Sequence, residues 1–418
     1  MVNRRQVIAG GATTLTLATA LGQGRAFAAD KEVLIGAIYP LSGSDAQAGI
    51  EAKNAMETAI DIINNSYDFD LIEAKNAGLP NLGGAKVKVI YADHQGDPEK
   101  GRTAAERLIT QNNVVALIGC YPSAVTAVVS YVAERYGVPM LTASSSAPSL
   151  TTHHLKYFFR PSANDIMYTK TMFDFFDAER AKGKKIETLA LFHEDSIFGT
   201  DSSKIEKQFA AQRGYKVVAD IKYQTNAPSL TSEVEQLRAV NADVLMPSSY
   251  TPSAILLTKT MADLGYKPKN IMAQAGGFST QATYSAVGNL LNGAITRASF
   301  SLDMASKRPS IGIVNDMFKK RSGINLDDNT SRQLMGLLIL ANAINRAGST
   351  KGDKIRDALA ATDIPGDQTI MPWSKVAFNA DGQNPYANAV LWQYVSNKFV
   401  TIYPQADAAA PAIWPMNA

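Results

Sequence analysis

Residues 85–143 read "AKVKVIYADHQGDPEKGRTAAERLITQNNVVALIGCYPSAVTAVVSYVAERYGVPMLTA", and this stretch decides the fold. Its apolar runs at 85–93, 114–120 and 138–143 are typical of strands, and the two amphipathic stretches between them are typical of helices. Pro98 suits the first turn of the first helix. Strands that alternate with helices in this way predict a parallel sheet wrapped by helices.

The same alternation continues on both sides of this stretch. A strand at 33–43 and a helix at 49–66 precede it. Beyond it the pattern restarts, with helices near 165–181, 200–213, 229–239 and 252–264 and strands at 188–195, 216–223, 242–250 and 270–277. We therefore predict an α/β protein with two doubly wound parallel-sheet lobes. Ligands of such sheets bind beyond the carboxyl ends of the strands, so the default pocket is the cleft between the lobes.

The composition is that of a folded protein of two or more domains. The chain has 418 residues, of which 46% are hydrophobic and 19% charged, with a formal net charge of +3. No basic run is interleaved with aromatic residues, which argues against a nucleic-acid partner. Cys120 is the single cysteine, so the chain can form neither an intramolecular disulfide nor a cysteine-based zinc site.

Residues 1–28 have the features of an export signal. Arg4 and Arg5 precede a mildly apolar stretch, and Ala26-Phe27-Ala28 is a small-x-small cleavage site. The stretch is too short for a membrane span, which needs about 20 predominantly apolar residues. The paired arginines resemble those of a twin-arginine signal. We expect cleavage after residue 28 and a mature protein in the periplasm.

Serine residues follow two neighbouring predicted strands. Ser123 follows the strand at 114–120, where we expect it to be the N-cap of the next helix. Ser144, Ser145 and Ser146 follow the strand at 138–143 and precede Pro148, a residue that favours the first turn of a helix. Each serine alone is consistent with ordinary capping. Two helix N-termini side by side, with their unpaired N–H groups, also suit a carboxylate or a phosphate.

The second half supplies two aromatic residues, Phe198 and Tyr250, which also follow strands. They are consistent with the walls of a pocket and equally with plain packing. Catalytic patterns are missing: the four histidines lack metal-site spacing, and the sequence has no nucleophile elbow, phosphate loop or dinucleotide fingerprint. We expect no enzymatic activity, no cofactor and no metal.

Five segments occur in order: "VLIGAIYPLSGSDAQAG", "YADHQGDPEKGRTAAERLI", "VVALIGCYPSAVT", "GVPMLTASSSAP" and "FFRPSAND". Together they resemble the periplasmic leucine/isoleucine/valine-binding proteins of ABC importers, across essentially the whole mature chain. The resemblance implies a type I periplasmic binding fold, in which three crossover strands join two lobes that close on a ligand like a hinge. It places lobe 1 at 29–160 plus 296–370 and lobe 2 at 161–295 plus 371–418.

The resemblance also assigns ligand contacts. In this family the positions of Ser123, Ser144 and Ser146 hold the α-carboxylate of the ligand, which leaves Ser145 as a bystander. Tyr250 matches an aromatic contact of lobe 2, and Phe198 matches a position usually held by tyrosine. We count Tyr121, in the loop that carries Ser123, and Gln274 with the ligand-binding residues.

The chain departs from the family pattern in three ways. Members that bind α-amino acids carry an acidic residue near 271–277 that pairs with the ammonium group, and this chain has Gln274 and Ala275 there. Ala48 stands where an aromatic residue is frequent, which suggests a differently shaped or larger pocket. The disulfide of some members cannot form, because Gly96 lies near the partner position of Cys120. We expect the carboxylate anchor to be retained without the usual ammonium partner.

We therefore predict a monomeric periplasmic solute-binding protein of an ABC transporter. Its ligand is a hydrophobic or aromatic carboxylate, or a compound like a branched-chain amino acid, which it delivers to the permease subunits. One alternative is a ligand of the amide type. Another is a ligand-sensing receptor or regulator with the same fold, and a third is a hydrolase or dehydrogenase on an α/β scaffold.

Overall fold

The computed structural model describes residues 32–274 and 276–416, so the predicted export signal and Ala275 lie outside the described residues. The first strands form a parallel sheet in the order β2-β1-β3-β4-β5. These strands are β1 (Glu32–Tyr39), β2 (Lys86–Asp93), β3 (Ala116–Gly119), β4 (Met140–Leu141) and β5 (Phe158–Phe159). They alternate with helices α1 (Ala46–Asn64), α2 (Pro98–Thr110) and α3 (Ser123–Tyr136), as predicted.

Local chemistry sets the ends of these helices. Helix α2 begins at Pro98, and the side chain of Asp97 accepts hydrogen bonds from the N–H groups of Glu99 and Lys100. Helix α3 ends at Gly137, whose φ of 63° lies in the left-handed region that glycine adopts without strain. Such start and stop signals are short-range, so the sequence predicts these boundaries within a few residues.

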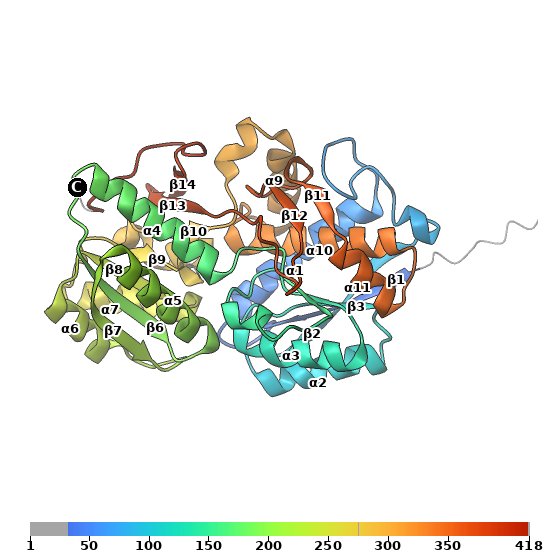
Figure 1. Cartoon of the computed structure of the whole chain (residues 1–418), viewed down its shortest axis with the longest axis horizontal. Coiled ribbons are helices and arrows are strands. Elements are labelled where there is room, and N and C mark those ends of the chain that lie inside the picture. The colour runs from blue at the N-terminus through green and yellow to red at the C-terminus, as the bar shows by residue number, and fades with distance from the viewer. Residues whose placement is uncertain (1–31, 275, 417–418) are drawn as a thin grey trace, which may run out of the picture.

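A second group of strands lies beside the first in Figure 1. The order β7-β6-β8 is parallel, and bridge pairing between Leu245 and Ile271 continues the sheet to β9 and its neighbours in the order β9-β10-β13-β14. These strands are β6 (Thr188–Glu194), β7 (Lys216–Tyr223), β8 (Val244–Ser248), β9 (Met272–Ala273), β10 (Ile295–Ala298), β13 (Val390–Val395) and β14 (Lys398–Tyr403). The helices of this group are α4 (Asp165–Ala181), α5 (Ile197–Arg213), α6 (Thr231–Val240), α7 (Thr251–Asp263) and α8 (Gln281–Val287).

The fully parallel sheet predicted for this second group is wrong at its edge. Strand β13 pairs antiparallel with both β10 and β14. The connection from β13 to β14 is Ser396-Asn397, with φ angles of 49° and 65°. Two successive residues with positive φ form a tight hairpin turn, which joins only antiparallel strands. The doubly wound α/β fold itself is confirmed.

The remaining elements return to the side of the first sheet. They are α9 (Pro309–Ser322), α10 (Asp328–Ala347), α11 (Gly352–Ala360), β11 (Asp363–Pro365) and β12 (Lys375–Ala377). Strands β11 and β12 pair antiparallel with each other as a separate sheet. We call β1–β5, α1–α3, α9–α11, β11 and β12 the first lobe, and we call α4–α8, β6–β10, β13 and β14 the second lobe (Figure 1). Helix α10 is buried along most of its length, with Leu334, Leu337 and Ile339 fully inaccessible. Its buried residues are polar from Asp328 to Gln333 and mainly apolar from Leu334 to Ile344, so the second half of the helix contributes to the apolar core.

The chain passes between the lobes after β5, after β10 and before β13. Main-chain hydrogen bonds join two of these passages, because Arg160 donates to Gly382 and accepts from Asn384. The boundaries near 160, 295 and 370 remain a prediction. We propose that the third lies after Ala377, since β12 pairs with β11 of the first lobe.

Candidate ligand-binding site

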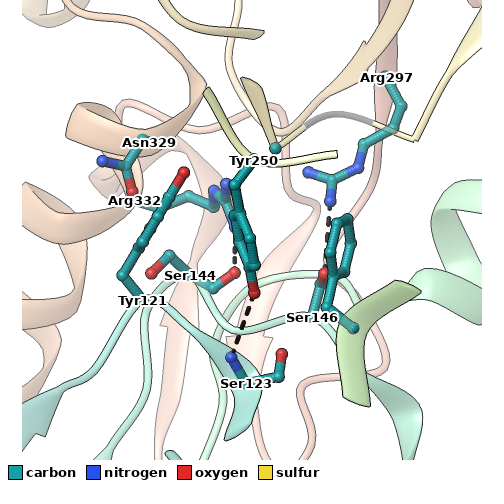
Figure 2. Close-up of a pocket in the computed structure, with 10 residues that line it drawn as sticks. Tyr121, Ser123, Ser144, Ser146, Tyr250, Arg297, Asn329 and Arg332 are labelled. Atoms are coloured by element: carbon teal, nitrogen blue, oxygen red, sulfur yellow. Dashed lines mark hydrogen bonds between the residues drawn. The ribbon is translucent and has the colours of Figure 1, made fainter. Parts of the chain in front are cut away.

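One cavity lies where the two lobes meet, at the carboxyl ends of β3 and β4 (Figure 2). The first lobe contributes the loop after β3 with the first residue of α3, the loop after β4 and the start of α10. The second lobe contributes the start of α5, the loops after β8 and β9, and strand β10. The described residues that line the cavity are Tyr121, Ser123, Ser144, Ser146, Phe198, Tyr250, Gly276, Arg297, Asn329 and Arg332. The structure thus brings together six of the seven residues that the sequence singles out. The seventh, Gln274, lies elsewhere.

Ser123 presents both its main-chain N–H and its hydroxyl at this cavity. The N–H donates to the hydroxyl oxygen of Tyr250 at 3.3 Å, across the two lobes (Figure 2). The hydroxyl is buried and has no hydrogen-bond partner. The expected N-cap position is wrong by one residue, because Pro122 has the extended backbone of an N-cap and Ser123 is the first helical residue. The hydroxyl of Ser123 therefore does not cap its own helix.

Ser144 and Ser146 bring two further hydroxyl groups to the cavity. The hydroxyl of Ser144 accepts from Nε2 of Gln333 at 2.8 Å, and that of Ser146 accepts from Arg297 at 3.4 Å. The helix expected at Pro148 is a four-residue 3-10 turn, Pro148–Thr151, and no serine side chain caps it. A single turn has little dipole, so the polarity here comes from the hydroxyl groups and the arginine.

Ser145 points away from the cavity and ties the two loops together. Its hydroxyl donates to the carbonyl oxygen of Tyr121 at 2.9 Å and lies 2.7 Å from the hydroxyl of Thr126. Thr126 in turn accepts from the N–H of Cys120. These bonds hold the loop after β3 against the loop after β4, which fixes the spacing of the serines on either side. The contacts favour a structural role for Ser145.

Three aromatic rings form one wall of the cavity. The ring of Tyr250 lies between the other two, with centroids 5.3 Å from that of Tyr121 and 5.1 Å from that of Phe198. Such spacings are those of favourable aromatic pairs. Tyr121 has a φ of 82°, in the left-handed region, where a side chain other than glycine is strained. The strained backbone places the ring of Tyr121 against the second lobe.

The carboxyl group of Glu194 holds the main chain of Tyr250 in place. Sequence reasoning did not single out this residue. One oxygen of the carboxyl accepts from the N–H of Tyr250 at 3.2 Å and from the hydroxyl of Ser253 at 2.8 Å. The side chain is 1% exposed. Burial raises the pKa of Glu194 to about 7, although the hydrogen bond from Ser253 opposes this effect. In the sequence it reads as an ordinary acid at the end of a strand.

The raised pKa of Glu194 predicts a dependence of stability on pH. Between about pH 4.5 and 7 the folded protein binds more protons at this site than the unfolded chain, so the free energy of unfolding falls as the pH rises. Glu194→Gln keeps an acceptor for Tyr250 and cannot ionise. We expect the variant to be about 2–3 kcal/mol more stable than the parent at pH 8 and close to it at pH 4.5.

Denaturant titrations at the two pH values measure this difference. Glu187→Gln is the control, because Glu187 is exposed. Equal pH profiles of the parent and Glu194→Gln would show that the carboxyl does not carry the shift.

A cluster of buried charges forms the floor of the cavity. Both oxygens of Asp328, the first residue of α10, are engaged: one accepts from the N–H of Ser299 at 2.6 Å and the other from Arg332 at 2.5 Å and Arg297 at 3.3 Å. The side chain of Arg297 is 2% exposed and that of Arg332 is 4% exposed. Sequence reasoning missed the cluster, because it joins two segments about 30 residues apart, Arg297 and Ser299 on one side and Asp328 and Arg332 on the other.

Gln274 faces the core of the second lobe. Its side chain is fully buried, and Nε2 donates to the hydroxyl of Thr169 on α4 at 2.8 Å. This contact favours a packing role.

Among the described residues no group of three or more His, Cys, Asp or Glu is placed to hold a metal ion. None of the described helices is long and apolar enough to cross a membrane.

The geometry matches a known family. The model of the periplasmic binding protein family matches residues 32–398, and the chain belongs to this family. The resemblance to the leucine/isoleucine/valine-binding proteins is thereby confirmed. The Leu/Ile/Val-binding protein homolog 7 of Brucella abortus (strain 2308) is 27% identical over 405 residues, which is 94% of this chain and 97% of that protein.

Solved structures share the fold. The leucine-binding protein LivK of Thermotoga maritima superposes with a TM-score of 0.76 at 19% identity, covering 89% of this chain and 98% of that one. A solute-binding protein of an ABC transporter from Rhodopseudomonas palustris BisB5, in complex with 3,4-dihydroxybenzoic acid, gives a TM-score of 0.74 at 16% identity, covering 91% and 98%. These neighbours confirm the type I periplasmic binding fold.

Proposed function

We propose that this protein is the solute-binding component of an ABC transporter and binds a small carboxylate in the cavity between its lobes. One observation carries the proposal: hydroxyl groups from two adjacent strand ends of the first lobe share one cavity with an aromatic wall to which both lobes contribute. Ser123, Ser144 and Ser146 supply donors for the carboxylate. Tyr121, Phe198 and Tyr250 supply apolar surface for the rest of the ligand.

The ligand class is a hydrophobic or aromatic carboxylate, or a compound like a branched-chain amino acid. Relatives support both forms, since one solved neighbour is a leucine-binding protein and another holds a dihydroxybenzoic acid. The aromatic wall favours a ligand with a planar or branched apolar group. Gln274 supplies no charge for an ammonium group, and its side chain is already bonded to Thr169.

Binding requires the lobes to part. The cavity has a volume of about 20 Å³, which is space for one water molecule. Tyr250 spans it and bonds to Ser123 of the opposite lobe, and Asp201 of α5 accepts from the N–H of Ser149 at 3.0 Å. A ligand the size of an aromatic acid enters only when these inter-lobe contacts break and Tyr250 moves aside. Hinge motion of this kind is a common way to enclose a ligand.

The partners follow from this role. We propose that the protein is exported, works as a monomer and presents its ligand to the transmembrane permease subunits of the transporter. It binds and releases the solute without chemical change, and it needs no cofactor.

A panel of ligands tests the proposal by thermal shift on refolded protein. We expect at least one aromatic or branched-chain carboxylate to stabilise the fold, by about 2.7 kcal/mol at 100 times its Kd. Purified protein incubated with the same compounds should leave them chemically unchanged. If neither aromatic acids nor branched-chain amino acids stabilise the fold, the proposed function is wrong.

A further inference from the structure

Arg297 is a buried cation that its neighbours only loosely satisfy. It lies on β10, and its guanidinium carbon is 3.7 Å from the centroid of the Tyr168 ring, which fixes the plane of the group. Its terminal nitrogens lie 3.3 Å from Asp328, 3.4 Å from Ser146 and 3.7 Å from Asp165. Its Nε has no partner. Charge-assisted hydrogen bonds are usually about 2.7–2.9 Å long.

Arg332 lines the same cavity and is bonded much more closely. Its Nε donates to the carbonyl oxygen of Asp328 at 2.9 Å, and its terminal nitrogens donate to the carbonyl oxygen of Ser144 at 2.8 Å and to the carboxylate of Asp328 at 2.5 Å. The hydrogen-bond donors of Arg332 are therefore occupied by Asp328 and by the carbonyl oxygen of Ser144, which holds the loop after β4 in place. Arg297 is left with donors that remain available in the cavity.

The charged side chains that line the cavity, among the described residues, are these two arginines, and no acid lines it. Behind them, Asp328 accepts from both arginines and Oδ2 of Asp165 accepts from Ser202. Oδ1 of Asp165, 3.7 Å from Arg297, has no hydrogen-bond partner. One oxygen of Glu194 accepts from Tyr250 and Ser253, the other has no partner, and the residue lies outside the lining. A ligand ammonium would meet two guanidinium groups there, whereas a carboxylate would meet the cation that has donors to spare.

We propose that Arg297, beside Ser146, is the charge partner of the ligand carboxylate, and that the physiological ligand is an aromatic monocarboxylate without an ammonium group. This inference rests on the proposed function and narrows it. The guanidinium reaches the cavity from β10, and in Figure 2 it lies on the opposite side of Tyr250 from Tyr121. A monocarboxylate with an aromatic ring places its charge at Arg297 and its ring beside Tyr121, Phe198 and Tyr250.

Calorimetry with charged and uncharged pairs of probes tests this inference. The probes are benzoate, 4-hydroxybenzoate and phenylacetate, each beside its amide, together with leucine and phenylalanine. For the parent protein we expect at least one of the acids to bind roughly 100-fold more tightly than its amide and than either amino acid. Arg297→Gln should weaken that acid roughly 30-fold and change its amide less than threefold, which removes most of the preference for charge.

Arg297→Lys keeps the charge and should recover part of the lost affinity, which separates charge from packing. The matched control is Arg308→Gln, because Arg308 is a half-buried arginine that bonds to the carbonyl oxygens of Thr369 and Met371 away from the cavity. If Arg297→Gln does not fold, the parent's preference for acid over amide and Arg297→Lys still decide the outcome.

Three results overturn the inference. Equal losses for the acid and its amide in Arg297→Gln would give Arg297 a structural role only. Leucine bound as tightly as the best aromatic acid would overturn the inference and leave the proposed function standing. Failure of every probe to bind the folded parent protein would overturn both.

Discussion

The double variant Ser123→Ala/Ser146→Ala is expected to bind its carboxylate ligand about 3–5 kcal/mol more weakly than the parent protein. Each hydroxyl can give one hydrogen bond to the charged group, and such bonds contribute about 1.5–3 kcal/mol each. Both serines are buried at the cavity, at 1% and 3% exposure. Water therefore cannot replace the lost donors. The affinity change is measured by calorimetry with whichever acid the ligand panel identifies.

The control for this double variant is Ser130→Ala. Ser130 is a buried serine on α3, as Ser123 is, but its hydroxyl bonds to the carbonyl oxygen of Ala127 within the helix. We expect unchanged affinity in the control and an unchanged fold in both proteins. A double variant that keeps full affinity would mean that the carboxylate anchor lies elsewhere.

Asp328→Asn is expected to lower the free energy of unfolding by about 3–5 kcal/mol. The carboxylate of Asp328 is fully buried and bonds to two buried arginines, Arg297 and Arg332. Removing its charge leaves both cations in the interior without their shared counter-ion, and breaking a buried ion pair from one side costs that much. Urea titration at neutral pH measures the loss.

Asp316→Asn is the control for this substitution, because Asp316 is exposed on α9. Its effect should stay within about 0.5 kcal/mol, as for most surface substitutions. Equal effects of the two substitutions would show that the arginines find other partners and that Asp328 is not their essential counter-ion.

Local patterns predict most of this fold. Helix α4 and strand β7 occupy the predicted ranges, 165–181 and 216–223, residue for residue. Their boundaries depend on neighbours in the chain, such as Asn164, whose side chain caps α4. The antiparallel edge of the second lobe was missed, because pairing direction there depends on a two-residue turn at Ser396-Asn397. Helix α10 was missed, although Asp327 and Gly348 are local start and stop signals for it.

The residues of the candidate site likewise divide into those that local patterns predict and those that only the tertiary fold brings together. Ser123, Ser144 and Ser146 follow neighbouring strands, so the parallel topology alone brings their loops together. Arg297 and Asp328 lie on either side of the passage that follows β10 and meet only where the two lobes meet, and neither differs from a surface charge in its sequence context. Gln274 was singled out because it lies near the position of the family's acidic residue. In the structure its side chain bonds to Thr169 and faces the core of the second lobe.

The paired passages at Arg160 and Gly382–Asn384 have a mechanical consequence. Because hydrogen bonds join their main chains, these two segments bend together as one ribbon. If the lobes part as proposed, we expect this pairing to make the two segments move together and to restrict the directions in which the lobes can open. Under the proposed function, a membrane partner would then meet two well-defined outlines and could distinguish loaded from empty protein by shape.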